Sequence, residues 1–190
     1  MDLVFARAMS QALAAAPKIP FSADLIRSCL DPQTRPIDAL FERAWRDGLG
    51  SLAGRSERGR LNGVTGHVGE SVAALLLDEL GHTVVWQFAG PSSGGHGADL
   101  IVLSPDDQLL VVEVKTTLRA GRWPRPSHRD LVQLEAAWLD KDDNPGLATW
   151  DLRSDDVHAA VILINCAQCH WRAAVTSDFR TVQAIAEPAA

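Results

Sequence analysis

The 190-residue sequence is poor in cysteine, with Cys29, Cys166 and Cys169 only. Three unevenly spaced cysteines are too few for a disulfide framework, so a reducing, cytoplasmic location fits better than secretion. Long apolar runs are missing as well: stretches such as AALLL and VILI are far shorter than the roughly 20 residues of a transmembrane helix. The N-terminal stretch carries Asp2 and lacks the apolar core of a signal peptide. We therefore expect a soluble cytoplasmic protein without a membrane partner.

Basic residues are outnumbered, because 18 Lys and Arg stand against 24 Asp and Glu, for a formal net charge of −6. This balance excludes a uniformly basic nucleic-acid binder. The charges are unevenly distributed, however: six aspartates lie between residues 140 and 156, whereas residues 119–129 contain basic residues and no acid. We expect any contact with a nucleic-acid backbone to be confined to that basic stretch.

The length suits one domain with an appended segment. Residues 1–61 contain helix-like pieces interrupted by four prolines, with an amphipathic stretch at 37–46, and predict a helical N-terminal extension. From residue 62 to residue 190 the pattern is regular and predicts the order α-β-β-β-α-β-β, an α/β domain with a central mixed sheet. The second helix of that domain is expected at 127–139, where Ser127 and Asp130 have the spacing of a capping box.

The third predicted strand, within QLLVVEVKTT, combines a dense apolar run with two charges. Such a run is typical of a strand buried on both faces, where an unpaired charge costs several kcal/mol. Because side chains alternate along a strand, Glu113 and Lys115 share one face, and Val112 and Val114 share the other. We interpret the two charges as functional rather than as a structural ion pair, which is the alternative.

Two further carboxylates are expected near this strand. Asp99 opens the preceding strand, and the turn sequence SPDDQ predicts a hairpin that brings Asp99 close to Glu113. Glu70 lies at the edge of the apolar face of the preceding helix. Carboxylates beside an ammonium group can hold a hard divalent cation and a water molecule, which Lys115 could orient or help to deprotonate.

In this arrangement Glu70, Asp99 and the sequence Glu113-Val114-Lys115 resemble the PD-(D/E)XK nuclease superfamily. The helix opening GxxGE, residues 66–70, is similar to the Holliday-junction resolvase and Mrr-like branch. The resemblance covers about residues 62–176 and implies a restriction-endonuclease-like core, α-β-β-β-α-β.

The resemblance also implies an activity: a Mg²⁺- or Mn²⁺-dependent nuclease, endonucleolytic on DNA, with RNA the less favoured substrate. It implies that Asp99, Glu113 and the backbone carbonyl of Val114 hold the metal while Lys115 serves the attacking water. Gln133 resembles the catalytic glutamine of some branches. The absence of tyrosine, with Trp138 after that glutamine, disfavours the exonuclease branch.

The stretch after Lys115 is basic and contains a tryptophan. Arginines contact phosphates, and an interleaved indole can stack on a base or sugar. We therefore expect this stretch to bind nucleic acid, with a merely solvated basic loop as the alternative. The residues concerned are Arg119, Arg122, Trp123, Arg125 and Arg129.

Other functions remain open from the sequence alone. The same scaffold could be a non-catalytic nucleic-acid-binding or protein-interaction module, and a homodimer would allow both DNA strands to be cut. The stretch Cys166-Ala-Gln-Cys169-His170 matches the haem-attachment pattern CxxCH and is also half of a zinc site. We interpret it instead as a hairpin turn with small, semi-buried cysteines.

Overall fold

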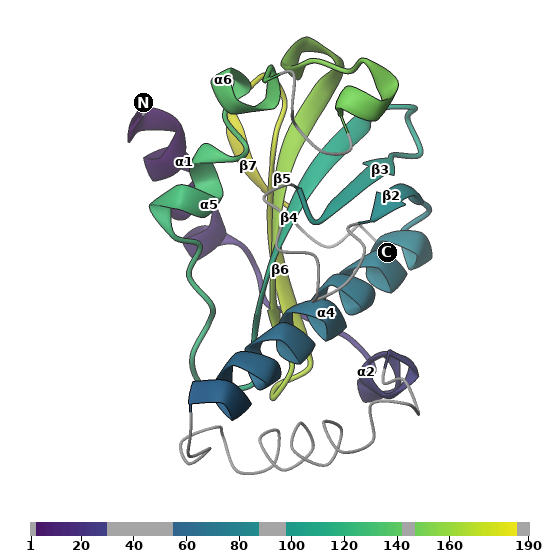
Figure 1. Cartoon of the computed structure of the whole chain (residues 1–190), viewed down its shortest axis with the longest axis vertical. Helices are drawn as coiled ribbons and strands as arrows, with labels where there is room; N and C mark the ends of the chain where they lie inside the picture. The colour runs from purple at the N-terminus through teal and green to yellow at the C-terminus, as the bar shows by residue number, and fades with distance from the viewer. Residues whose placement is uncertain (1–2, 30–54, 88–97, 142–146, 186–190) are drawn as a thin grey trace.

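The computed structural model describes residues 3–29, 55–87, 98–141 and 147–185. Within these residues the chain is a mixed α/β fold, in which helices cover both faces of a central sheet (Figure 1). This confirms the expected α/β class with a central mixed sheet. The amphipathic stretch at 37–46 lies outside the described residues.

The sheet has seven strands in the described part of the chain, in the order β1-β6-β5-β4-β3-β2, with β7 also paired to β6. Only the central pair, β4 and β5, is parallel, whereas the other described pairs are antiparallel, so the sheet is mixed. The strands are β1 (Ile19–Pro20), β2 (Thr83–Gln87), β3 (Leu100–Leu103), β4 (Leu109–Thr117), β5 (Val157–Asn165), β6 (His170–Thr176) and β7 (Val182–Ile185).

Helices form a layer on each side of this sheet. The α4 and α2 side chains pack on one face, and those of α1, α5 and α6 pack on the other. None of the described helices is long and apolar enough to cross a membrane. The helices are α1 (Leu3–Ala15), α2 (Ala23–Ser28), α4 (Arg55–Glu79), α5 (His128–Val132) and α6 (Ala136–Leu139), with 3₁₀ turns η2 (Ala148–Trp150) and η3 (Ser154–Asp156).

Helix α4 starts earlier than the sequence pattern indicates, so the domain division expected between residues 61 and 62 falls inside it. Its C-terminus is as expected. Gly81 has a φ of +84°, and the N–H of His82 donates to the carbonyl of Leu77 at 2.9 Å. Together with the bond from Gly81 N–H to the Asp78 carbonyl, this is a Schellman cap, which a residue with a Cβ would strain.

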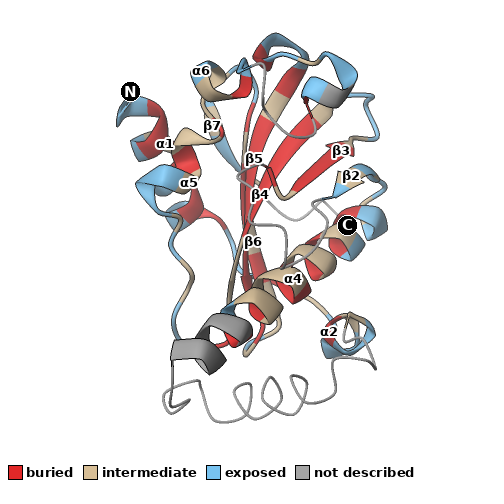
Figure 2. Ribbon diagram, viewed as in Figure 1, coloured by how far each residue is buried: buried red, intermediate tan, exposed pale blue. Residues whose placement is uncertain are grey.

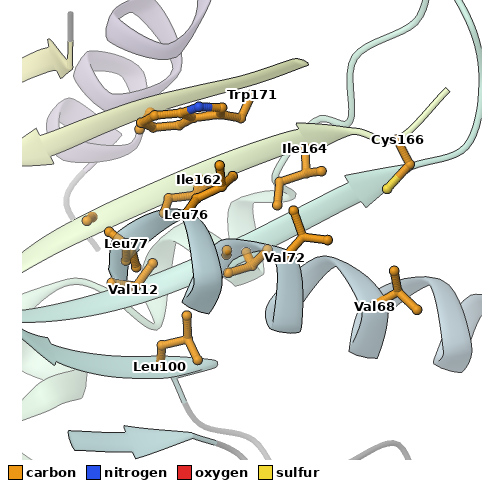
Figure 3. Packing of buried hydrophobic residues seen from close by; sticks show 14 of the residues in the cluster. Val68, Val72, Leu76, Leu77, Leu100, Val112, Ile162, Ile164, Cys166 and Trp171 are labelled. Atoms are coloured by element: carbon orange, nitrogen blue, oxygen red, sulfur yellow. The ribbon is translucent and has the colours of Figure 1, made fainter. Parts of the chain in front are cut away.

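The core between α4 and the sheet comes from one apolar stripe of the helix. Figure 3 shows Val68, Val72 and Leu76 on α4 directed at the sheet, where Val112 and Ile162 lie on the central strands. Buried residues run along β4 and β5 and extend to the inner side of α4 (Figure 2). This packing fixes α4 across the strand that carries the predicted site.

The prediction of a single helix over residues 127–139 is wrong. The capping box is present, with the Ser127 side chain accepting from the Asp130 N–H, but α5 ends at Val132 and a new helix, α6, begins at Ala136. In one continuous helix Leu134 and Leu139 would point in directions about 140° apart. The break allows both side chains to be buried in the same core cluster.

Candidate functional site

A close approach between α4 and β4 positions the first carboxylate. A Cβ at Gly69 would lie 1.6 Å from Oγ1 and 2.7 Å from Cβ of Thr116, so only glycine allows this separation. At Gly66 an added Cβ would make only an ordinary contact, 3.7 Å from Glu70 Oε1. Of the two glycines in the GxxGE opening, Gly69 therefore allows α4 to approach the end of β4, which places Glu70 beside the sheet.

Strand β4 carries its charges on the face away from α4. Val112 and Val114 belong to the core under α4, as expected from the alternation, and Glu113 and Lys115 project from the opposite face. Glu113 is only 3% exposed, and its Oε1 lies 2.5 Å from the Lys115 ammonium. Its second oxygen, Oε2, is buried and has no hydrogen-bond partner within the described part of the chain.

Asp99 reaches the same place from the β3–β4 hairpin. Its N–H donates to the Val112 carbonyl at 3.1 Å, which extends the antiparallel pairing one residue beyond Leu100. Its side-chain Oδ2 accepts a 2.7 Å hydrogen bond from the N–H of Val114. The hairpin therefore places Asp99 opposite Glu113 on the neighbouring strand, with its carboxylate bonded to the backbone of Val114.

A further carboxylate, Asp130 at the start of α5, belongs to the cluster and was missed as a site residue. One of its oxygens, Oδ2, accepts from the Ser127 N–H in the capping box, and the other, Oδ1, lies 3.2 Å from the Lys115 ammonium. The capping box was the only local signal at this position. The contact with Lys115 depends on how α5 packs against the sheet, which no local pattern specifies.

Three carboxyl groups in this cluster, those of Glu70, Asp99 and Glu113, have raised pKa values. Burial raises the pKa of Glu70 to about 7, with a further upward push from Asp99. Burial also raises the pKa of Asp99 and of Glu113, and the negative charge of Asp99 adds to the effect at Glu113. Burial alone would lower the pKa of Lys115, but the adjacent Glu113 carboxylate outweighs it and the net shift is upward. Lys115 therefore stays protonated.

Among the described residues, this cluster has more carboxyl groups than cationic groups. Four carboxylates, Glu70, Asp99, Glu113 and Asp130, interact with a single ammonium group, Lys115, which leaves a formal charge of −3 when all are ionised. A divalent cation would offset this excess. The unpartnered Oε2 of Glu113 is an oxygen that such a cation could use.

The oxygen ligands of this site suit a hard cation that needs only a few ligands from the protein. Among the described residues, no three His, Cys, Asp or Glu side chains lie close enough together to hold a metal ion. Mg²⁺ is usually held by one or two carboxylates and several waters, so it does not need three side chains. The residues available to it here are Asp99, Glu113 and the Val114 carbonyl, the set that the resemblance implies.

A pocket of about 250 Å³ opens beside this cluster. It lies between α4 and the end of β4, and it joins the two elements that carry Glu70 and Lys115. A water molecule and part of a phosphodiester could therefore approach Glu70, Asp99 and Lys115 from solvent, whereas the buried Glu113 does not line this pocket. The lining includes Asn62, Glu70, Asp99, Val114, Lys115 and Thr116.

Gln133, the predicted catalytic glutamine, lies at the C-terminus of α5, the helix that carries Asp130. It is the C-cap of α5, and its N–H bonds to the carbonyls of Arg129 and Leu131. Within the described residues, no hydrogen bond joins its half-buried side chain to Asp99, Glu113 or Lys115.

The basic stretch is anchored at the base of the sheet. The fully buried Asn165 at the end of β5 donates its side-chain amide to the carbonyls of Arg119 and Arg122, at 3.2 and 3.0 Å. Arg119 is half-buried, whereas Arg122, Arg125 and Arg129 are exposed. The stretch thus has a fixed backbone and exposed cationic side chains.

Trp123 is not a free stacking platform. It is half-buried against the core on the α1 side, and the guanidinium carbon of Arg172 lies 4.5 Å from its ring centre. This cation–π contact covers part of the ring that we expected to be available to a base or sugar. The indole still lines a second pocket, of about 410 Å³.

The CxxC sequence forms the turn between β5 and β6, as interpreted from the sequence. Cys166 is buried and Cys169 half-buried, with a φ of +50° at Cys169. Burial raises the pKa of both thiols, which keeps them protonated and unreactive as nucleophiles.

Comparisons with known proteins assign no family to this chain: no protein-family model, no curated protein and no solved structure matches it. The site therefore has to be interpreted from its own geometry and charges.

Proposed function

We propose that the chain is a Mg²⁺- or Mn²⁺-dependent nuclease of the PD-(D/E)XK type, with a restriction-endonuclease-like core, that hydrolyses phosphodiester bonds in DNA. The observation that carries the proposal is the buried cluster of carboxyl groups around Lys115, in which Glu113 Oε2 has no hydrogen-bond partner among the described residues. The order of the described elements from α4 to β6 is compatible with that core. DNA is preferred over RNA on the resemblance alone.

In this proposal each residue has a distinct task. Asp99, Glu113 and the Val114 carbonyl hold the cation, and a bound Mg²⁺ would polarise the phosphate and lower the pKa of a water. Lys115 keeps its proton, so it donates hydrogen bonds that orient the attacking water or a phosphate oxygen. Asp130 and Glu113 position the Lys115 side chain through their ion pairs. Glu70 lines the same pocket and is placed to hold a water molecule.

The test is cleavage of plasmid, linear duplex, branched DNA and RNA in the presence of Mg²⁺, Mn²⁺ or EDTA. We expect cleavage of DNA only with metal, and a loss of about a hundredfold or more in Glu113→Gln and Lys115→Ala, because each removes transition-state charge stabilisation. Glu79→Gln and Lys18→Ala remove the same charges at exposed positions and should cut like the parent.

Two results would overturn the proposal. If Glu113→Gln and Lys115→Ala cut as well as the parent, the activity comes from another site or from a contaminant. If the parent cuts no substrate with either metal, the chain is instead a non-catalytic nucleic-acid-binding or protein-interaction module.

A further inference from the structure

A second pocket, distinct from the one at the carboxylate cluster, lies on the α1 face of the sheet. Its floor contains Leu163 of β5 and Arg172 of β6, and α1 and residues 123–126 form its walls. Its volume of about 410 Å³ is in the range of small-ligand pockets, roughly 300–1,000 Å³. None of the catalytic tasks proposed above uses this pocket.

The lining combines cationic groups with an apolar, aromatic surface. Arg172 packs on the Trp123 ring, and its buried Nε has no hydrogen-bond partner in the part of the chain that the structure describes. Arg125 also lines the pocket and is exposed. Among the described residues, no acidic side chain forms an ion pair with either arginine. Guanidinium groups bind phosphate, and an indole beside Leu13 and Leu163 provides a surface for a base.

The register of the sheet relates this pocket to the carboxylate cluster. Lys115 is paired with Leu163, and Leu163 is paired with Arg172, so the three residues form one row across β4, β5 and β6. Side chains opposite one another in a sheet project from the same face, and two strand spacings amount to about 10 Å. The Lys115 and Arg172 side chains therefore project from the same face of the sheet, two strand spacings apart.

The wall of the pocket is also connected to the cluster through the chain. The stretch that contains Trp123 leads directly into α5, whose Asp130 pairs with Lys115. At its other end, Asn165 fixes the carbonyls of Arg119 and Arg122. The spacing between pocket and cluster is therefore set by backbone that is held at both ends.

We propose that this pocket binds one unpaired nucleotide of the DNA strand that reaches the carboxylate cluster, with a phosphate on Arg172 and Arg125 and the base beside Trp123. A base in an intact duplex would have to leave its stack to enter a pocket between a helix and a loop. The inference rests on the proposed function and adds a substrate class: DNA with a single-stranded segment, in preference to intact duplex.

Binding in EDTA separates the pocket from any cleavage. The probes are a fluorescein-labelled single-stranded oligonucleotide and the matching blunt duplex, measured by anisotropy. We expect the parent to bind the single strand more tightly than the duplex, and Arg172→Ala to weaken single-strand binding by about tenfold or more through loss of a charged phosphate contact. Arg180→Ala removes the same charge at an exposed position in the β6–β7 turn and should bind like the parent.

Trp123 is tested with two variants, because replacing the indole by alanine could disturb the packing around it. Trp123→Ala should weaken single-strand binding by at least about fivefold, and Trp123→Phe should recover most of it, since base–aromatic stacking needs a ring. Thermal unfolding of both variants separates a folding defect from a binding defect. Equal binding by parent, Arg172→Ala and Trp123→Ala to single strand and duplex overturns the inference, whether or not the parent cuts DNA.

Small probes identify the ligand chemistry. In calorimetric titrations, thymidine 5′-monophosphate should bind more tightly than thymidine or inorganic phosphate. Arg172→Ala should remove the advantage of the nucleotide over thymidine, because that advantage comes from the phosphate. If phosphate alone binds as well as the nucleotide, the pocket is a plain anion site and the inference is wrong. If the nucleotide binds as expected but no DNA is cut with any metal, the pocket assignment stands and the nuclease proposal is the one that fails.

Discussion

β4 and β5 are adjacent nine-residue strands at the centre of the sheet, and they differ in what they bury. In register, Glu113 lies beside Val161 and Lys115 lies beside Leu163. Val161 is fully buried and apolar, whereas Glu113 is equally inaccessible and carries a carboxyl group. The neighbouring strand shows that an apolar side chain suits this layer of the sheet, so folding does not require the charges of β4.

The two strands differ because the charged side chains of β4 have partners of opposite charge. Glu113 has Lys115 at 2.5 Å, and Lys115 has Asp130 as a second partner, whereas Val161 and Leu163 of β5 are apolar and need no partner. A buried charge is tolerated where a partner is positioned for it and is costly where none is. The contrast suggests three experiments, in order of decreasing expected effect.

The largest effect should come from a carboxylate introduced in the apolar strand. In Val161→Glu the new carboxylate lies beside Glu113, and Lys115 is already paired with Glu113 and Asp130, so we expect the free energy of unfolding to fall by more than about 4 kcal/mol. Val85→Glu makes the same change at a position on β2 that is 38% exposed, and should stay within about 0.5 kcal/mol of the parent. Chemical denaturation followed by circular dichroism measures both free energies of unfolding. Similar losses in the two variants would mean that the ion-pair partners of β4 do not explain why β4 and not β5 carries buried charges.

A smaller loss is expected when the charged strand loses one partner. Lys115→Met leaves Glu113 buried without its cation and should cost about 3 kcal/mol. The loss should be greater at pH 9 than at pH 6, because burial and Asp99 raise the pKa of Glu113, and a protonated carboxyl needs no partner.

The double variant Glu113→Leu with Lys115→Met makes β4 resemble β5 at this layer. We expect it to be at least as stable as Lys115→Met and close to the parent in denaturant titrations, because replacing both members of a buried pair is often neutral. A double variant less stable than the single one would show that the pair is needed for folding, which is the structural alternative to a functional site.

The smallest of the three effects concerns the approach of α4 to β4. Gly69→Ala forces a methyl group into Thr116 and should cost about 2 kcal/mol, because either α4 or β4 has to shift. Gly66→Ala meets only Glu70 Oε1 at 3.7 Å and should be neutral or stabilising by up to about 1 kcal/mol, since alanine favours a helix. Thermal and urea unfolding compare the two, and equal destabilisation would mean that Gly69 has no special role.

Features that depend on neighbours in sequence were predictable. The turn at 104–108 implied the β3–β4 hairpin, and alternation along β4 assigned Glu113 and Lys115 to one face. Gly81 and the Ser127–Asp130 capping box also follow from local chemistry and are present. These are short-range rules, and each needs only a few residues.

Features that depend on tertiary packing were not predictable. β1 has only two residues, one of them Pro20, and gives no periodic signal, yet it pairs with β6. The contact of Asp130 with Lys115 and the pocket beside Arg172 arise from segments far apart in the sequence. Even the break between α5 and α6 follows from burying two leucines, which overrides a helical pattern.

The parallel pairing of β4 and β5 also affects how the protein folds. Parallel neighbours cannot be joined by a tight turn, so the connection from residue 118 to residue 156 has to close before their ladder can form. The β3–β4 hairpin, by contrast, closes over a short turn and brings Asp99 to Glu113 early. In kinetic terms, the carboxylates can meet in a local hairpin, whereas the row from Lys115 to Arg172 is completed only with the slow, long-range step.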